Sequence, residues 1–211
     1  MPMGNVTDLP NRQAHDQQLV AAIKRKARES GEVSLAFFED QAETVSGLAA
    51  AMSERFAAGG RLFVMGNGGS SCDAEHVSVE FMHPIFEKRK PLPCISLTTG
   101  NALLTAISND ADFSRVFSTQ LRSLATAQDM ALAISTSGMS ANLVSALKEA
   151  RAIGCMTIAF GGKDGGRVKD LADWSLVAPS YSIHRIQEVH TLLLHILWDS
   201  IHLCMGEEDV V

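Results

Sequence analysis

The chain has 211 residues, of which 46% are hydrophobic and 20% charged, and its net charge is −6. This length and composition fit one globular domain with a substantial core and argue against a disordered, fibrous or two-domain chain. The acidic balance gives no electrostatic reason to expect nucleic acid as a partner. Four scattered cysteines, and no apolar run near the roughly 20 residues that span a bilayer, favour a reducing, cytoplasmic location over a disulfide-bonded or membrane one.

The N-terminal part of the chain is predicted to be helical after a flexible tail. Residues 1–15 are polar, contain two prolines and are assigned to the tail. From residue 17 to 58 the apolar residues recur at helical spacing, and Gly31 interrupts the pattern, so two amphipathic helices are predicted. These helices are expected to belong to a single α/β domain that covers residues 16–211.

The rest of the chain alternates between short apolar runs and helical patterns. Five runs lack polar alternation, which is typical of strands buried on both faces; they cover residues 61–65, 93–97, 130–134, 156–160 and 174–177. Helical patterns follow at residues 71–82, 102–108, 112–125, 140–153, 165–171 and 183–205. Strands alternating with helices predict a doubly wound, five-stranded parallel sheet. The ligand of such a sheet binds beyond the carboxyl ends of its strands.

The loop after the first strand has the composition of an anion site. It reads GNGGSS, residues 66–71, and leads directly into a helix. Its glycines let the backbone approach a ligand, its serines supply hydroxyl groups, and the helix N-terminus presents unpaired N–H groups. A tight strand-to-helix turn with a serine cap explains the same residues. The loop matches neither the Walker pattern nor GxGxxG, which argues against a nucleotide.

Two later loops would open onto the same edge of the sheet. The first, STSGMS at residues 135–140, carries four hydroxyl groups; Ser140 is placed to cap the next helix, and the other three exceed what one cap needs. The second, GGKDGG at residues 161–166, is either a third wall of the site or only a flexible turn. The GNGGSS and STSGMS loops contain no Lys or Arg, which favours a small phosphate ester over a triphosphate.

Two helices carry candidates for acid–base chemistry or metal binding. His76 and Glu80 are four residues apart, so they share a helix face and suit a metal site, an acid–base pair or a plain surface contact. The last helix places Gln187, Glu188 and His195 in an apolar stretch. At about 100° per residue, Glu188 and His195 share a face, whereas Gln187 lies about 80° away from His195. Spacing alone therefore favours Glu188 as the partner of His195.

Together these segments resemble the sugar isomerase (SIS) domain family, and within it the phosphoheptose isomerases. The matching stretches are GNGGSSCDAEHVSVEF (66–81), Asn109–Asp110, ISTSGMSAN (134–142), GKDGG (162–166), and RIQEVH (185–190) with His195. The resemblance implies a flavodoxin-like sheet, a homotetramer with active sites between subunits, and a cytoplasmic isomerase. It also implies the reaction, from sedoheptulose 7-phosphate to D-glycero-D-manno-heptose 7-phosphate, and a place in lipopolysaccharide heptose synthesis.

The resemblance also implies roles for individual residues. Glu80 is implied as the catalytic base and His195 as the acid. The resemblance also implies one bound zinc ion, with Gln187 rather than Glu188 among its ligands. The implied ligands are His76, Glu80, Gln187 and His195. Contacts to the sugar or its phosphate are implied for Asn67, Gly68, Gly69, Glu80, Asn109, Asp110, Ser135, Thr136, Ser137, Ser140 and Gln187. Isomerisation moves a proton between adjacent carbons, and a carboxylate with an imidazole suits that task.

Three positions depart from the phosphoheptose isomerase pattern. Met139 stands where these proteins usually have Asn, Pro84 where they often have Arg, and His184 where some have Asp. The departures leave the implied acid, base and metal ligands in place and bear on which sugar is bound. The family also contains a non-catalytic tetramer that binds a DNA replication initiator protein, but relatives of that tetramer lose ligand residues that this chain keeps, which favours the enzyme.

Overall fold

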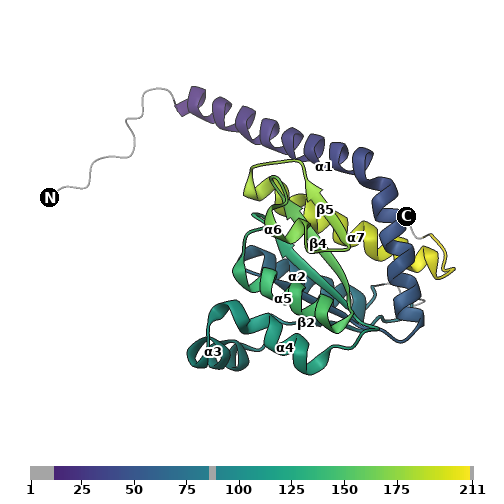
Figure 1. Cartoon of the computed structure of the whole chain (residues 1–211). Coiled ribbons are helices and arrows are strands. Elements are labelled where there is room, and N and C mark those ends of the chain that lie inside the picture. Colours follow the sequence, from purple (N-terminus) through teal and green to yellow (C-terminus); the bar gives the residue numbers. More distant parts are fainter. Residues whose placement is uncertain (1–11, 86–88, 210–211) are drawn as a thin grey trace.

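A computed structural model describes residues 12–85 and 89–209 (Figure 1). Its five strands are β1 (Leu62–Gly66), β2 (Cys94–Ser96), β3 (Met130–Ser135), β4 (Met156–Gly162) and β5 (Trp174–Ala178). They form one sheet in the order β2-β1-β3-β4-β5, and all neighbouring strands are parallel. The predicted doubly wound sheet is confirmed. The strand order reverses at β1, so the loops after β1 and β3 lie at the switch point where such sheets bind ligands.

Helices cover both faces of the sheet (Figure 1). One face packs against α1 (Arg12–Ala57), α2 (Gly69–Met82) and α7 (Ile183–Cys204), and the other against α4 (Val116–Leu124), α5 (Ala141–Ile153) and α6 (Gly166–Lys169). α3 (Asn101–Asp110) and a 3₁₀ turn (Phe113–Arg115) precede α4. Alternate residues of β1 serve the two cores: Leu62 and Val64 face the first, Phe63 and Met65 the second. Burial on both sides explains why the strands have no polar alternation.

The prediction of two separate N-terminal helices is wrong. α1 is a single helix of 46 residues. It passes through Gly31 without a break and begins at Arg12, inside the segment predicted as tail; residues 1–11 lie outside the described part of the chain. One glycine in a helix costs only about 1 kcal/mol relative to Ala. Just before Gly31, α7 anchors the helix: Arg185 donates to the Lys26 carbonyl at 2.6 Å, and Ser30 donates to Glu188 at 2.6 Å.

No helix within residues 12–85 and 89–209 is both long and hydrophobic enough to cross a bilayer.

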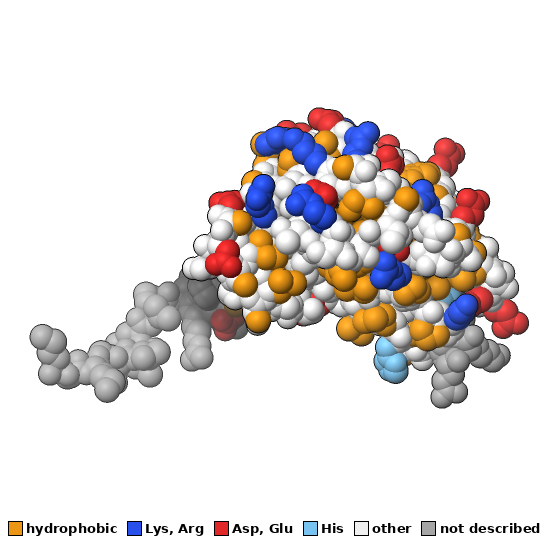
Figure 2. Space-filling model, turned by 60° about the horizontal axis from the view of Figure 1, so that its bottom comes forward, with side chains coloured by type: hydrophobic (Ala, Val, Ile, Leu, Met, Phe, Trp, Pro, Cys, Tyr) orange, Lys and Arg blue, Asp and Glu red, His pale blue; other side chains and the backbone are white. Residues whose placement is uncertain are grey.

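Figure 2 turns the underside of Figure 1 toward the viewer, and on that face Lys and Arg side chains are interspersed with acidic and apolar ones. α3 contributes no buried residue, and Leu103 on it is 48% exposed. Apolar side chains therefore remain exposed at the β2 end of the molecule.

A buried carboxylate joins the start of β1 to the start of β3. Asp129, 1% exposed, accepts hydrogen bonds from the Arg61 backbone N–H at 2.8 Å and from the Arg61 guanidinium at 2.9 and 3.2 Å. It also accepts from the Thr126 backbone N–H at 2.7 Å and the Thr126 hydroxyl at 3.0 Å. Burial raises the pKa of Asp129, but the hydrogen bonds from Arg61 and Thr126 together outweigh burial and lower the pKa below 3.8.

Asp129→Asn should lower the free energy of unfolding at pH 7 by about 2–3 kcal/mol, because the amide leaves charge-assisted hydrogen bonds unmade. Because the folded-state pKa of Asp129 is depressed, its contribution is present above the ordinary pKa of 3.8 and is lost as the pH falls below that value. Urea unfolding of both proteins at several pH values measures the difference, with exposed Asp170→Asn as a control. An equal difference at pH 7 and pH 3 would contradict this account.

Candidate functional site

α2 and α7 bring together three of the predicted site residues, two of which are 119 positions apart in the chain. His76 Nε2 lies 3.3 Å from Glu80 Oε1 on the same helix and 3.3 Å from His195 Nε2 on α7. The two imidazole rings meet edge to face with their centroids 5.0 Å apart. One side-chain donor atom from each residue lies within 4.8 Å of the other two. We call this group the His76–Glu80–His195 cluster.

The cluster lies at the surface of the single chain. The side chains of His76 and Glu80 are 37% and 24% exposed, and His195 is exposed. Burial first, and then the charge of His76, lower the pKa of His195 below 6.5, while Glu80 opposes the shift. The His195 ring is therefore mostly neutral at pH 7. A neutral imidazole both accepts and donates a proton, as an acid–base group must.

Gln187 and Glu188 are adjacent on α7 but face different elements. Gln187 lies against the GNGGSS loop after β1 (residues 66–71), which we call the glycine loop. A Cβ added to Gly69 of this loop would fall 2.2 Å from the Gln187 side-chain nitrogen. Glu188 instead accepts hydrogen bonds from Ser30 of α1 at 2.6 Å and from Arg185 at 2.8 Å. The preference for Glu188 that spacing gives is therefore wrong, because α7 packs against α1 as well as α2 and Glu188 serves the α1 contact.

The glycine loop after β1 and the serine loop after β3 are tied together by a pair of amides. Asn67 donates to Asn142 at 2.9 Å, and Asn142 donates back to Asn67 at 2.8 Å. Asn142 was not among the predicted site residues, because a lone Asn in the first turn of a helix has no chemical signature in the sequence. The pairing fixes the distance between the two loops that the sequence assigned to a phosphate.

The segment after β4 lies against the serine loop. Val168 N–H donates to the Gly138 carbonyl at 3.1 Å, and a Cβ on Gly138 would fall 2.0 Å from the Gly165 carbonyl oxygen. Gly138 has φ +65°, a left-handed conformation that favours glycine. Of the two sequence interpretations of residues 161–166, this packing favours a third wall beside the serine loop.

The hydroxyl groups of the serine loop have different roles. Ser140 occupies the N-cap position of α5, but its side chain makes no capping hydrogen bond, so the predicted side-chain cap is wrong. Its carbonyl accepts from Val144 N–H at 3.0 Å instead. Ser135 accepts from Gly138 N–H at 3.0 Å and Ser137 from Met139 N–H at 3.3 Å. Because these two oxygens act as acceptors, each retains its own proton to donate to a ligand.

Asn109 and Asp110 lie apart from these groups in the hydrogen-bond network. Both are exposed at the end of α3, where Asn109 donates to Asp110 at 2.9 Å. Within residues 12–85 and 89–209, neither makes a hydrogen bond to a predicted site residue outside this pair. A single chain therefore does not connect them to the His76–Glu80–His195 cluster.

Comparison with known proteins decides the family. A family model described as "SIS domain" matches residues 27–162. The chain belongs to the SIS domain family. The matched SIS domain holds the glycine loop, His76, Glu80 and the serine loop, and it ends before α7 supplies Gln187 and His195.

Individual relatives of this SIS domain protein extend the similarity over most of the chain. The phosphoheptose isomerase of Aquifex aeolicus (strain VF5) is 39% identical over 191 residues, which cover 90% of this chain and 100% of that protein. Among solved structures, a phosphoheptose isomerase from Francisella tularensis superposes with a TM-score of 0.84 at 33% identity, covering 87% of this chain and 98% of that one. The phosphoheptose isomerase from Neisseria gonorrhoeae gives 0.81 at 35% identity, with the same coverages.

Two of the three donor separations in the cluster have the dimensions of a metal site. With metal–nitrogen bonds of about 2.0–2.1 Å, two donors of a tetrahedral site lie about 3.3–3.4 Å apart. The Nε2–Nε2 separation of the two histidines and the Nε2–Oε1 separation of His76 and Glu80 are both 3.3 Å. Two imidazole nitrogens and a carboxylate oxygen are also donors that divalent transition metals accept. The third pair, Glu80 and His195, is wider, between 4.0 and 4.8 Å, so a metal ion would draw these two side chains slightly together. With that adjustment His76, Glu80 and His195 fit a metal ion.

Proposed function

We propose that this protein is a phosphoheptose isomerase that interconverts sedoheptulose 7-phosphate and D-glycero-D-manno-heptose 7-phosphate. The observation that carries the proposal is the meeting of Glu80 and His195, from two helices, beside loops suited to a phosphate. An identity of 39% to the phosphoheptose isomerase of Aquifex aeolicus, over 90% of this chain, supports this choice of substrate. By the same similarity we assign the protein to heptose synthesis for lipopolysaccharide, in the cytoplasm.

Glu80 and His195 would divide the proton transfers between them. The Glu80 carboxylate removes a proton from the carbon next to the substrate carbonyl, and the electron pair left behind forms an enediolate. The His195 imidazole gives a proton to the carbonyl oxygen and takes one from the neighbouring hydroxyl. Protonated Glu80 then returns its proton to the adjacent carbon, so that atoms and electrons balance without an external oxidant. Each such positioned proton transfer contributes about 10²–10⁴-fold to the rate.

The glycine and serine loops would hold the phosphorylated end of the substrate. Four hydroxyl groups suit the phosphate oxygens: those of Ser135, Thr136, Ser137 and Ser140. The backbone of Asn67, Gly68 and Gly69 lies across the amide pair from them, and Gln187 closes the side toward α7. Asn109 and Asp110 are assigned to the sugar hydroxyls. This arrangement would place the carbonyl end of the sugar over the His76–Glu80–His195 cluster.

We further propose that the metal is zinc, one ion per subunit, held by His76, Glu80, Gln187 and His195. The distances from His76 to Glu80 and to His195 support this assignment. The Gln187 side chain lies against Gly69, at the N-terminus of α2, the helix that carries His76 and Glu80. When bound, zinc would supply positive charge next to the substrate oxygens. Elemental analysis of the purified protein should find one zinc per chain. Chelation should abolish turnover and added zinc restore it, whereas zinc-free protein with full activity would overturn this assignment.

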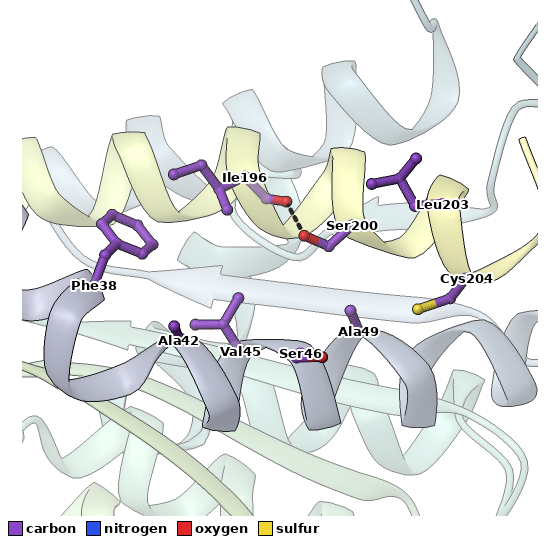
Figure 3. A pocket seen from close by; sticks show the side chains of 9 residues that line it. All are labelled: Phe38, Ala42, Val45, Ser46, Ala49, Ile196, Ser200, Leu203 and Cys204. Atoms are coloured by element: carbon purple, nitrogen blue, oxygen red, sulfur yellow. Dashed lines mark hydrogen bonds between the residues drawn. The ribbon is translucent and has the colours of Figure 1, made fainter. Parts of the chain in front are cut away.

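Exposed apolar residues around the cluster support a homotetramer that covers the site. Val79 and Met82 on α2 are 55% and 50% exposed, and Leu192 and Ile196 on α7 are 39% and 36% exposed. Ile196 also lines a groove of about 350 Å³ between α1 and α7, floored by Ala42, Val45 and Ala49 (Figure 3). A second subunit over these surfaces would exclude water from the acid–base pair. Light scattering of the purified protein should give four times the mass of one chain. An active monomer would contradict the proposed tetramer.

Direct assay tests the proposal. Purified protein incubated with sedoheptulose 7-phosphate should produce the aldose phosphate, detected by chromatography against a standard. The unphosphorylated ketose should react far more slowly, because the loops then have no phosphate to bind. A folded, zinc-loaded protein without turnover on this substrate or on related sugar phosphates would exclude the enzyme and favour the non-catalytic tetramer that binds a replication initiator.

A further inference from the structure

Asp73, one turn before His76 in α2, has no role in the site described so far. Its Oδ2 atom is buried and has no hydrogen-bond partner among the described residues. A buried carboxylate oxygen without a donor is costly, so an unpaired one points to a partner that comes with a ligand or a change of protonation.

His76 lies one turn after Asp73 on α2, and in this structure its ring nitrogens contact Glu80 and His195 while lying more than 4.0 Å from the Asp73 oxygens. Helical side chains lean toward the N-terminus of their helix, so the ring of residue 76 lies over the turn that contains residue 73. Its Nε2 atom faces Glu80 and His195, and within the described part of the chain its Nδ1 atom makes no hydrogen bond. Burial raises the pKa of the Asp73 carboxyl to about 6, and the charge of His76 opposes that rise. An unpaired acceptor and an unpaired ring nitrogen thus lie on adjacent turns.

We propose that Asp73 is a positioning residue that accepts a hydrogen bond from the Nδ1–H of His76. A metal on Nε2 leaves no proton on that atom, so the ring proton must reside on Nδ1, where it needs an acceptor. The orphan oxygen of Asp73 supplies it. The bond would fix the tautomer and orientation of His76, and through His76 the position of the ion between Glu80 and His195. The inference rests on the proposed metal site and adds to it a residue that does not touch the metal.

A purely structural role for Asp73 makes a different prediction. A carboxylate near a helix N-terminus stabilises the helix dipole, and its loss lowers stability without affecting metal affinity. Glu75 is the matched control, because it lies on the same helix, is exposed, and accepts a hydrogen bond from Thr98 at 3.2 Å. Glu75→Gln removes the same charge from the same helix and leaves the Asp73–His76 pair intact.

Zinc affinity, measured by competition with a chromogenic chelator, tests the inference on the full chain. Asp73→Asn should weaken zinc binding about 10–100-fold, whereas Glu75→Gln should bind zinc as the unmodified protein does. Equal affinities of the unmodified protein and Asp73→Asn would overturn the proposal, as would equal losses in the two variants or an unmodified protein that binds no zinc. One-to-one zinc binding with this pattern, but no turnover of sedoheptulose 7-phosphate, would sink the proposed reaction and leave the role of Asp73 standing.

A second measurement needs no folded Asp73 variant. In the zinc-loaded protein labelled with ¹⁵N-histidine, the His76 ring should carry its proton on Nδ1, and this proton should be protected from exchange with solvent. The signal is assigned by its loss in His76→Gln. A proton on Nε2, or an Nδ1 proton that exchanges as fast as that of an exposed histidine, would contradict a hydrogen bond to buried Asp73.

Discussion

Glu80→Gln is expected to lower kcat for sedoheptulose 7-phosphate by about 10²–10⁴-fold, because the amide cannot accept the proton that leaves the substrate carbon. The fold should be unaffected, since the polar contact of Glu80 is with His76 on its own helix and its side chain is 24% exposed. Single-turnover and steady-state assays measure kcat, and zinc content is measured on the same samples, so that loss of the base is separated from loss of a metal ligand.

Glu188→Gln is the matched control for Glu80→Gln. Glu188 is the carboxylate that helix spacing favoured, but it faces Ser30 and Arg185. Its replacement should leave kcat within about twofold and lower stability by less than about 1 kcal/mol, as for other partly exposed ion pairs. If Glu188→Gln lost as much activity as Glu80→Gln, the assignment of the base would be wrong.

His195→Gln should lower kcat to a similar extent as Glu80→Gln. The double variant should have a kcat only slightly below that of the less active single variant. Residues that act as a unit give losses that do not add, because removing either partner already disables the step. Fully additive losses in the double variant would mean that Glu80 and His195 act independently, contrary to the single site in which their side chains meet.

The sheet was predictable from the sequence because strands buried on both faces leave an unmistakable pattern. Runs such as LFVM, at residues 62–65, have no polar residue to alternate with, and Gly- or Ser-rich loops mark where each strand ends. Parallel strands then dictate that the loops after β1 and β3 share one edge. The proximity of the GNGGSS and STSGMS loops thus followed from residue pattern and topology alone.

The parts that the sequence could not predict depend on packing between distant elements. Gly31 looked like a helix end, but contacts to α7 carry α1 through it. Glu188 looked like a site residue until α1 supplied Ser30 as its partner. Asn142 had no signal before it paired with Asn67. In each case the deciding neighbour lies more than 70 positions away in the chain, beyond the reach of periodicity or local propensity.

Gly138→Ala should be the most destabilising single substitution in the loops, lowering the free energy of unfolding by about 3–4 kcal/mol. Two costs combine: the φ of +65° is strained for any residue with a Cβ, and that Cβ would lie 2.0 Å from the Gly165 carbonyl oxygen. The collision is with backbone, so no side-chain rotation relieves it, and the serine loop must move away from the segment after β4. Phosphate binding should weaken together with stability.

Gly59→Ala isolates the first of these costs. Gly59 also has a left-handed φ, +87°, but a Cβ there would meet nothing within 4 Å. Only the conformational cost of about 1–2 kcal/mol then applies. Denaturant unfolding of both variants should therefore place Gly138→Ala at a clearly lower midpoint than Gly59→Ala. Equal midpoints would mean that the serine loop yields easily, and the hydroxyl groups it presents would then be held too loosely to position a phosphate over Glu80 and His195.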